Sequence, residues 1–492
     1  MRKGLTIAVF PVLTLLATAI SAFLSVYTFN LLAIALMTAK KIFSQGGDDP
    51  DPPAPEDLPI VTVQIPIYNE RTLVEGVLEN VTSLDYPKER LQTQILDDST
   101  DKETLQKEER LTKHYRKEGY DISLIHRDKR KGFKAGALNN GLKTAKGDYI
   151  VIADAGTISP RNFLKELITY FSEDEGLAFI QTKCEYSDRW FNWVTESNAI
   201  ARDVHYLVEQ PAKSWYNLLP NFSGKAGMWR REVLDKYGWD ERILTEDIEL
   251  SYRVQIDGWR SLYLHNPTCL IELPPSLMSL KTQQKRWTAG SAQSFRKLWR
   301  PILKSDKLNL GQKLESLIFL SSPIIHLAAL IAIILWVLAA ILEPETTLSL
   351  WLGTFAFSVY MAFMSMATNL SVLMGVIRSS GRRGRKLLTI PLTATIITAS
   401  LIANARGAFQ GFLRDNLTFE RTLKYGITCN TRKHEIRNNY RLGHLLRKNS
   451  IELVAGILMV VAAVRVLLLG QITSAIPVSY ISLVWMVSSF QE

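Results

Sequence analysis

Residues 60–66 read IVTVQIP, a short β-branched run that ends at a proline. Two similar runs follow it, QTQIL at residues 92–96 and YIVIA at residues 149–153. Segments with a helical pattern, residues 71–82 and 104–118, lie between these runs. Strand–helix–strand alternation of this kind predicts an α/β domain whose sheet is mostly parallel, with crossover helices on its faces.

The predicted strands end in polar or acidic residues. Asp97 and Asp98 follow the second run, and Asp154 follows the third. In open parallel sheets, ligands bind in the crevice at the carboxyl ends of the strands, so these carboxylates are expected in the site. Carboxylates repel a nucleotide diphosphate unless they hold its base and ribose, or bind a divalent cation that bridges to phosphate. The pattern therefore predicts a nucleotide and a hard metal ion.

Composition separates the chain into a middle part and two apolar ends. The chain has 492 residues and is 47% hydrophobic, yet residues 46–310 have the composition of an ordinary α/β domain. The formal net charge is +10. Beside long apolar runs, such a basic balance indicates cytoplasmic loops at an anionic membrane face, in preference to nucleic-acid binding. The cysteines are widely spaced and form no CxxC motif, which argues against a disulfide framework and a zinc site.

Apolar runs with the length of a membrane-spanning helix, about 20 residues, occur near both ends of the chain. They are residues 5–37, 317–342, 348–377, 453–470 and 472–490. A further run, 387–413, contains Pro391, Asn404 and Arg406 and has basic segments on both flanks. If it crossed the membrane, one basic flank would lie outside, against the positive-inside bias. We therefore expect it to lie on the cytoplasmic surface. Arg465, inside the fourth run, is either a functional charge or one that snorkels to the interface.

Five motifs in the middle part follow the order of a known family. They are VQIPIYNE (63–70), LDDSTD (96–101), GFKAGALNNG (132–141), TEDIELSYR (245–253) and QQKRW (283–287). In this series the chain resembles the family-2 glycosyltransferases of GT-A type, and most of all the cellulose-synthase-like branch that includes plant β-mannan and glucomannan synthases. The resemblance covers residues 58–300 and continues more weakly through 414–426. It implies an α/β GT-A domain with a mostly parallel sheet, inserted between about five membrane spans and interfacial helices.

The resemblance and the apolar runs together predict an integral, multi-pass membrane protein with a cytoplasmic catalytic domain. The predicted parts are an N-terminal transmembrane helix (1–43), a linker (44–59), the cytosolic GT-A catalytic domain (60–280), interfacial helices with QxxRW (281–310), transmembrane helices (311–378), a cytosolic interfacial segment with a basic loop (379–450) and a C-terminal transmembrane hairpin (451–492). The linker is rich in glycine and proline, as extended connecting segments are.

The resemblance implies a donor site for a nucleotide sugar. Tyr68 and Glu70 are expected to border the base pocket, and Asp97 and Asp98 to hold the base. Lys134 is expected to neutralise donor phosphate, and Gly132 and Gly136 beside it would allow the backbone to approach closely. The plainer alternatives are a turn that ends a strand for the two aspartates, and a solvated basic face for residues 129–131.

The resemblance also implies a divalent metal ion, Mg²⁺ or Mn²⁺. Asp154 opens the family's DxD motif, whose carboxylates bind the metal ion of the donor. Here the motif reads Asp154-Ala155-Gly156, so the second carboxylate is absent. The loss of an anionic ligand weakens a hard-cation site. Water, diphosphate oxygens or another carboxylate would have to complete the shell; the alternative is a weakly active or altered variant.

Two further motifs are expected to carry the reaction. In the TED motif, we expect Asp247, beside Glu246, to take the proton from the acceptor hydroxyl. Threonine followed by acids also fits an N-capping box for a helix at 247–254. In QxxRW, the resemblance places Gln283 and Arg286 at the donor diphosphate and Trp287 on the acceptor sugar. A membrane-surface helix over residues 281–304 is a compatible interpretation.

Two loops complete the expected site. Residues 223–227 (SGKAG) resemble the family's acceptor-side loop, which brings Gly227 to the acceptor; Lys225 stands where a threonine is more usual. Phe419, Arg421 and the residues after them resemble a segment that covers the donor site, and a plain basic surface loop is the alternative.

These features predict an inverting transferase with one base and no nucleophile pair, which makes a β-linkage from an α-linked donor. UDP-glucose, GDP-mannose and UDP-N-acetylglucosamine all remain as donors. The acceptor is either a growing polysaccharide, with translocation through the spans, or a membrane lipid that receives one sugar. A catalytically decayed membrane scaffold is the alternative of another class. A transporter would leave the acidic motifs unexplained.

Overall fold

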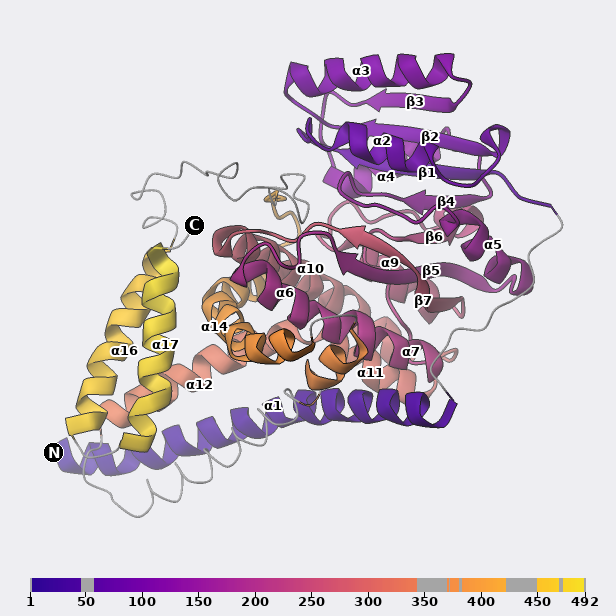
Figure 1. The fold of residues 1–492 in the computed structure, drawn as a ribbon. Helices are drawn as coiled ribbons and strands as arrows, with labels where there is room; N and C mark the ends of the chain where they lie inside the picture. The colour runs from indigo at the N-terminus through magenta and orange to yellow at the C-terminus, as the bar shows by residue number, and fades with distance from the viewer. Residues whose placement is uncertain are drawn as a thin grey trace.

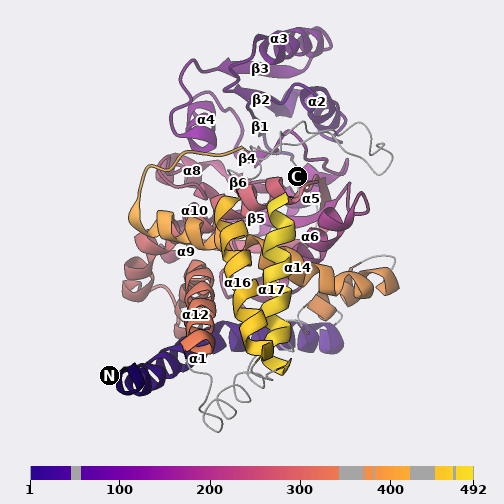
Figure 2. The same cartoon turned by 90° about the vertical axis from the view of Figure 1, so that its left-hand side faces the viewer.

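The computed structural model describes residues 2–45, 57–342, 370, 372–379, 383–421, 449–468 and 472–490. An α/β domain lies at one end of the molecule, and long helices lie at the other (Figures 1 and 2). The third predicted span, 348–377, and the basic loop fall almost entirely outside the described residues.

A seven-stranded mixed sheet forms the centre of the α/β domain, with the strand order β3-β2-β1-β4-β6-β5-β7. Most pairs are parallel; β6 alone in this sheet runs antiparallel to both of its neighbours, β4 and β5. The mostly parallel α/β fold that the sequence predicts is confirmed. The strands are β1 Val61–Ile67, β2 Leu91–Asp97, β3 Asp121–His126, β4 Tyr149–Ile152, β5 Leu177–Tyr186, β6 Gly227–Arg230 and β7 Arg260–Ile271.

Buried polar side chains pair across the centre of the sheet. Gln64 on β1 lies opposite Gln94 on β2, and its amide Nε2 donates to Oε1 of Gln94 over 3.0 Å. The Thr62 hydroxyl likewise donates to Gln92 over 2.8 Å. Strands buried on both faces are usually continuous apolar runs, and an unpaired polar group there is costly. The cross-strand hydrogen bonds offset part of that cost, while the buried Oε1 of Gln64 makes no hydrogen bond within the described residues.

The helices cover both faces of the sheet and continue into the long helical part. Those of the α/β domain are α2 Val74–Thr82, α3 Lys102–Lys117, α4 Phe133–Leu142, α5 Phe163–Glu173, α6 Trp193–Val204, α7 Gln210–Trp215, α8 Arg231–Tyr237 and α9 Glu246–Ile256, with short turns η1 Lys88–Arg90 and η2 His205–Glu209. The remaining helices are α1 Arg2–Gln45, α10 Leu277–Lys304, α11 Leu310–Leu320, α12 Pro323–Leu342, α14 Arg383–Leu413, α16 Ser450–Leu468 and α17 Ile472–Phe490.

Three helical stretches are long and apolar enough to cross a membrane, namely Ala22–Ser44, Gly384–Leu413 and Ser450–Leu468. The pair Leu310–Leu320 and Pro323–Leu335, bent by 54°, counts as a fourth if it acts as one broken span. Helices α16 and α17 lie side by side in both views (Figures 1 and 2). The predicted spans at 5–37 and 453–470 overlap two of these stretches, the span at 317–342 overlaps the bent pair, and the last predicted span contains a shorter apolar helix, Val478–Phe490. The run 387–413, which the sequence placed on the membrane surface, also has the length and composition of a span.

Helix α14 covers the run that the sequence placed on the membrane surface. It packs along α10 and α6, and polar contacts fasten both of its ends to the rest of the protein. Arg385 forms an ion pair with Glu196 of α6 over 2.8 Å. Near the other end, the Asn404 amide donates to Gln284 of α10 over 3.1 Å. A helix with charged contacts to the α/β domain is thereby kept beside that domain.

Candidate active site

A cavity of about 490 Å³ lies at the edge of the sheet where the parallel strands end. Its walls include residues just after β1, β2 and β4, and the loop that leads into β6. Because β6 runs in the opposite direction, its amino end meets the carboxyl ends of the parallel strands. Helices α9 and α10 and the segment after α14 close the cavity on the remaining sides.

Most of the side chains that the sequence singled out line this one cavity. They are Tyr68, Glu70, Asp98, Lys134, Asp154, Glu246, Asp247, Gln283, Arg286 and Trp287. Residues separated by more than 200 positions in the chain are therefore brought together. Two predicted residues, Asp97 and Gly227, are not among the lining residues.

Asp97 lies behind the cavity wall and is fully buried. Its carboxylate accepts a hydrogen bond from the Ser99 amide over 2.8 Å and contacts His126 Nδ1 at 2.7 Å. Burial raises the pKa of the neighbouring Glu108 to about 9, with a further contribution from Asp97. Asp97 is therefore not among the residues that line the cavity, and its contacts hold the end of β2 in place.

Gly227 is the first residue of β6 and is buried in the sheet. A Cβ at this position would lie 2.2 Å from the carbonyl oxygen of Ile180 on β5. The glycine is therefore needed for close approach of the two strands. Its role in the structure is to place the preceding loop, 223–226, at the cavity.

Asp98 is held by an arginine that the sequence did not single out. Arg127 donates from Nε and Nη2 to the two carboxylate oxygens over 2.7 and 2.6 Å. Arg130 lies over the Tyr68 ring, with its guanidinium carbon 3.5 Å from the ring centre. The signal in the sequence was the basic run around residues 127–131, which fits a solvated face equally well. In the structure Arg130 lines the cavity and Arg127 holds the buried Asp98, whereas Lys129 is exposed.

Two lysines engage the Asp154 carboxylate. Lys134 Nζ lies 2.8 Å from Oδ1, and Lys225 Nζ lies 3.4 Å from Oδ2. Burial acts to lower the pKa of the Lys134 ammonium, but attraction to Asp154 and Glu246 outweighs it and raises that pKa. Lys225 was noted in the sequence only as a departure from a pattern; its contact with Asp154 depends on the fold of the 223–227 loop.

The surroundings of Asp154 do not fit a metal centre. Position 156 is a glycine, and two ammonium groups face the carboxylate oxygens that a cation would need. Within the described ranges, no group of three or more acidic, histidine or cysteine side chains could hold a metal ion. In nucleotide sites Mg²⁺ is bound by one or two carboxylates together with substrate phosphates and waters. Here the one carboxylate has both of its oxygens paired with lysine ammonium groups, which repel a cation.

The two acids of the TED motif sit at the start of α9, inside the cavity. Burial raises the pKa of Glu246 to about 7, and the charge of Asp247 adds to this effect. Burial also raises the pKa of Asp247, against the attraction of Lys134. A carboxylate whose pKa is raised toward neutrality is a better proton acceptor for an alcohol than an ordinary surface carboxylate.

Thr245 does not form the capping box that its sequence allowed. Its side chain makes no cap hydrogen bond; the hydroxyl instead lies 3.2 Å from the Ser294 hydroxyl on α10. The Leu244 amide donates to Gln293 on the same helix over 3.1 Å. The start of α9 is therefore tied to α10, which carries QxxRW.

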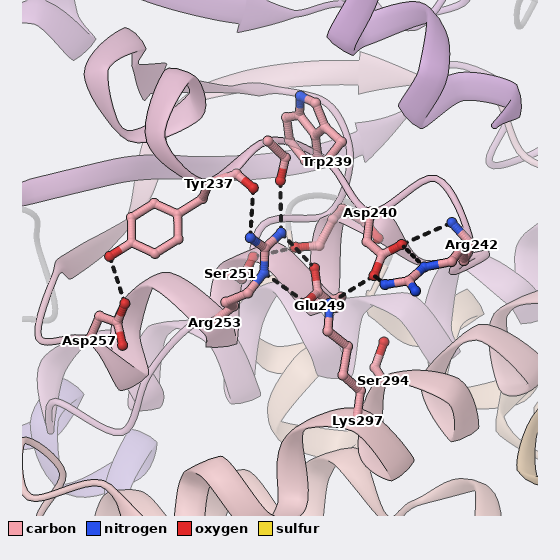
Figure 3. A network of polar contacts seen from close by, with 12 residues as sticks. Tyr237, Trp239, Asp240, Arg242, Glu249, Ser251, Arg253, Asp257, Ser294 and Lys297 are labelled. Atoms are coloured by element: carbon pink, nitrogen blue, oxygen red, sulfur yellow. Dashed lines mark hydrogen bonds and ion pairs between the residues drawn. The ribbon is translucent and has the colours of Figure 1, made fainter. Parts of the chain in front are cut away.

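A second polar network holds α9 from behind (Figure 3). Arg253 donates to both oxygens of the buried Glu249 and to the carbonyls of Tyr237 and Gly238, at 2.7–3.0 Å. Lys297 of α10 forms ion pairs with Glu249 and with Asp240 (Figure 3). These contacts fix the first turns of the helix that presents the acidic pair.

Helix α10 presents the QxxRW side chains from the opposite wall. The Arg286 guanidinium lies 4.2 Å from the centre of the Phe419 ring. Arg421 donates to the carbonyl of Asn69 over 2.8 Å, so the segment after α14 reaches the loop after β1. The structure thus places Phe419 and Arg421 at the cavity, while the residues from 422 to 448 lie outside the described part.

Trp287 faces a buried arginine that sequence reasoning missed. Arg202 of α6 lies 4.9 Å from the centre of the Trp287 ring, and both residues line the cavity. In the described part of the chain, the buried Nε atoms of Arg202 and Arg286 make no hydrogen bond. Buried donors of this kind normally have an acceptor, so their presence here indicates space for an anionic or polar ligand.

Residues 59–290 match the family described as glycosyltransferase-like family 2. The chain is 32% identical over 303 residues to glucomannan 4-beta-mannosyltransferase 7 of Arabidopsis thaliana, covering 60% of this chain and 54% of that protein. It is 31% identical over 303 residues to glucomannan 4-beta-mannosyltransferase 1 of Oryza sativa, covering 58% of that protein. The chain therefore spans little more than half the length of these relatives.

Among solved structures, the chain is similar to a mannosyltransferase from Pyrobaculum calidifontis, which was determined in complex with GDP-Man and Mn²⁺. The TM-score is 0.53 and the sequence identity is 22%, over 74% of this chain and 98% of that one. At this identity the likeness concerns the fold, and it confirms the GT-A type of α/β domain that the sequence predicts.

Proposed function

We propose that this chain, whose residues 59–290 belong to the glycosyltransferase-like family 2, is a membrane-embedded inverting glycosyltransferase. It transfers a sugar from a nucleotide-diphosphate donor to a growing β-linked glycan. One observation carries the proposal. The acidic pair Glu246 and Asp247, whose pKa values are raised, lies in the same cavity as the cations Lys134 and Arg286. Such a site brings a proton acceptor and an anion-binding wall to the same small volume.

The reaction is a single displacement. Asp247 takes the proton of the acceptor hydroxyl, and the oxygen attacks the anomeric carbon on the side opposite the nucleotide. The bond from that carbon to the diphosphate oxygen breaks, and the electron pair leaves with the diphosphate. Arg286 and Lys134 stabilise the departing charge in a buried setting, where such attraction is stronger than in water. Inversion turns an α-linked donor into a β-linked product without a covalent sugar–enzyme intermediate.

The remaining lining residues divide between donor and acceptor. On the donor side, Tyr68 and Glu70 follow β1 and Asp98 follows β2, so they form the pocket for base and ribose. Gln283 adds a polar group near Arg286. On the other side, Trp287 offers its ring to the acceptor sugar, since sugars stack on aromatic faces through their apolar C–H surface.

For the donor, we propose GDP-mannose, because the curated relatives at about a third identity are named mannosyltransferases. UDP-glucose and UDP-N-acetylglucosamine are the comparison donors. The divalent cation that the sequence predicts would have only Asp154 as its carboxylate ligand here.

The apolar helices support placement in a membrane. We propose that the α/β domain lies on its cytoplasmic side, because basic segments flank the apolar runs. Helix α14, which its ion pair with Glu196 keeps beside the α/β domain, is proposed to lie at the membrane surface. The acceptor would then be delivered at the inner face, next to Trp287 on α10.

Nucleotide release by membranes or detergent-purified protein tests this proposal. GDP release from GDP-mannose, with little or no release of UDP from the two comparison donors, is the expected result. Asp247→Asn must abolish it, because an amide cannot accept the proton. Retained turnover in that variant would remove Asp247 as the base, and no turnover of any donor by the parent chain would favour a decayed scaffold. Labelled product separates the acceptors: a ladder indicates a polysaccharide, and a single glycolipid indicates one transfer to a lipid.

A further inference from the structure

Two positions at which the sequence departs from the family pattern concern the same carboxylate, that of Asp154. The sequence has Gly156 where the resemblance predicts a second aspartate, and Lys225 where a threonine is more usual. In the structure, Lys225 reaches Asp154, the aspartate that remains. Loss of one negative charge and gain of one positive charge together raise the local formal charge by two. Two positive charges are what a divalent cation would bring.

From this coincidence we infer that Lys225, together with Lys134, supplies the positive charge at the donor diphosphate that a metal ion would otherwise supply, so that the donor binds without a metal ion. The inference rests on the proposed function, because it concerns the same donor. It makes Lys225 a donor-binding residue that the resemblance does not assign.

Both lysines are placed to bind a ligand in the cavity. Each keeps a minor exposed fraction, 19% for Lys134 and 16% for Lys225, and each lines the cavity. Their ammonium groups sit on different oxygens of Asp154, which spaces them on either side of one carboxylate. Lys134 also donates to the carbonyl of Gly224 over 2.7 Å. Two ammonium groups held in this way match the spread of charge on a diphosphate.

The backbone at Lys225 is fixed by a buried glutamine. The Gln181 amide donates to the carbonyls of Lys225 and Ala226 over 3.1 and 3.0 Å, and its oxygen accepts from the Ser223 amide over 2.6 Å. Gln181 is fully buried on β5. The loop is therefore held to the sheet, and the backbone of Lys225 is fixed before the donor binds. A charged group that takes the place of a metal ion acts best when it is already in position.

Asp154 acts in this arrangement as an anchor for the lysines. Without it, two ammonium groups in a partly buried cavity would repel each other, and the charge state of each would be harder to maintain. The same carboxylate that would hold a metal ion thus holds two fixed cations. The lysines are a fixed part of the chain, so donor binding no longer depends on the concentration of free divalent cation.

Nucleotide affinity tests the inference apart from catalysis. GDP and UDP are titrated into the purified full chain by calorimetry, once with EDTA and once with Mn²⁺, and binding of Mn²⁺ alone is followed by electron paramagnetic resonance. We expect the preferred nucleotide to bind in EDTA about as well as in Mn²⁺. We expect Lys225→Thr to lose about ten-fold or more of that affinity in EDTA, as removal of a charged hydrogen-bond donor does. Lys225→Arg keeps the charge and should keep the binding.

A double variant that reverses both departures from the family pattern gives a more decisive test than the single variants. The double variant Lys225→Thr with Gly156→Asp restores the family pattern, and we expect it to bind Mn²⁺ alone and to need Mn²⁺ for nucleotide. Lys129→Thr removes an exposed lysine outside the cavity and serves as the control for charge loss. Thermal unfolding of each variant shows that a loss of binding is not a loss of fold.

The outcomes separate the two proposals. If the parent chain binds nucleotide with Mn²⁺ but not with EDTA, or if Lys225→Thr binds as the parent does in EDTA, the inference is wrong and the proposed function stands. If the parent binds neither GDP nor UDP under either condition, both fall.

Discussion

A Cβ on Gly224 would lie 2.8 Å from Oδ2 of Asp247. Gly224 has a φ of +77°, a conformation that other residues rarely adopt. The loop that leads into β6 therefore passes directly against the proposed base, and only a residue without a side chain leaves the carboxylate where it is.

This contact predicts the effect of Gly224→Ala. The methyl group should displace the Asp247 carboxylate and lower kcat by about ten-fold or more, since catalytic groups depend on their position. Backbone strain should cost a further ~1–2 kcal/mol of stability. Nucleotide release and thermal unfolding measure the two effects. Gly119→Ala is the matched control, because Gly119 has a φ of +87° and nothing within 4 Å. Equal kcat values in the two variants would contradict the prediction.

The acidic pair predicts an acid limb in the pH profile. Burial raises the pKa of Glu246 to about 7 and that of Asp247 above its ordinary value. Protonation of Asp247 inactivates the base, so turnover should fall on the acid side, at a pH above the ordinary titration range of an aspartate, and should be retained at higher pH. Glu246→Gln removes a like charge, which lowers the pKa of its neighbour. The acid limb of the pH profile should then move to lower pH. An unchanged acid limb would show that the charge of Glu246 does not affect the pKa of Asp247.

Lys297 is predicted to position α9, the helix that presents Glu246 and Asp247 to the cavity. It joins Glu249, which is fully buried, to Asp240 (Figure 3). Lys297→Met should lower stability by about 2 kcal/mol, because a buried carboxylate loses one of its charged donors. It should also lower kcat and leave the donor KM unchanged, since Lys297 does not line the cavity. Lys165→Met removes an exposed ion pair with Asp85 and should change stability by less than ~1 kcal/mol.

Glu108 is predicted to weaken the fold at alkaline pH. Burial raises its pKa from 4.5 to about 9 in the folded protein. The folded state therefore holds a proton that the unfolded state releases, and stability is lost progressively as pH rises from 4.5 toward 9. Glu108→Gln cannot ionise, so its unfolding temperature should exceed that of the parent at about pH 8 and match it near pH 5. The exposed Glu109→Gln should show no such difference.

The sequence was sufficient to predict the central strands and most of the residues that line the cavity. The runs at 60–66, 92–96 and 149–153 became β1, β2 and β4, because β-branched and apolar residues suit buried parallel strands. Ten of the side chains singled out from ordered motifs line one cavity. Motif residues at strand ends converge because parallel strands share one carboxyl edge.

The sequence was not sufficient where contacts join distant segments. Asp97 and Asp98 are adjacent, and successive residues at a strand end point to opposite sides, so the pattern could not say which one faces the cavity. The pairing of Asp98 with Arg127, and of Trp287 with Arg202, depends on loops and helices whose packing no local pattern encodes. The capping box at Thr245 was a local expectation that a tertiary contact with Ser294 replaced.

The reversed direction of β6 has a consequence for how such chains diversify. Residues after β1, β2 and β4 reach the cavity where those strands end, whereas the 223–227 loop reaches the same edge just before β6 begins. Within this loop Lys225 pairs with Asp154 and Gly224 lies against Asp247. One short segment therefore touches both the proposed donor site and the proposed base. Exchange of residues 223–227 between relatives is expected to alter donor binding and catalysis together.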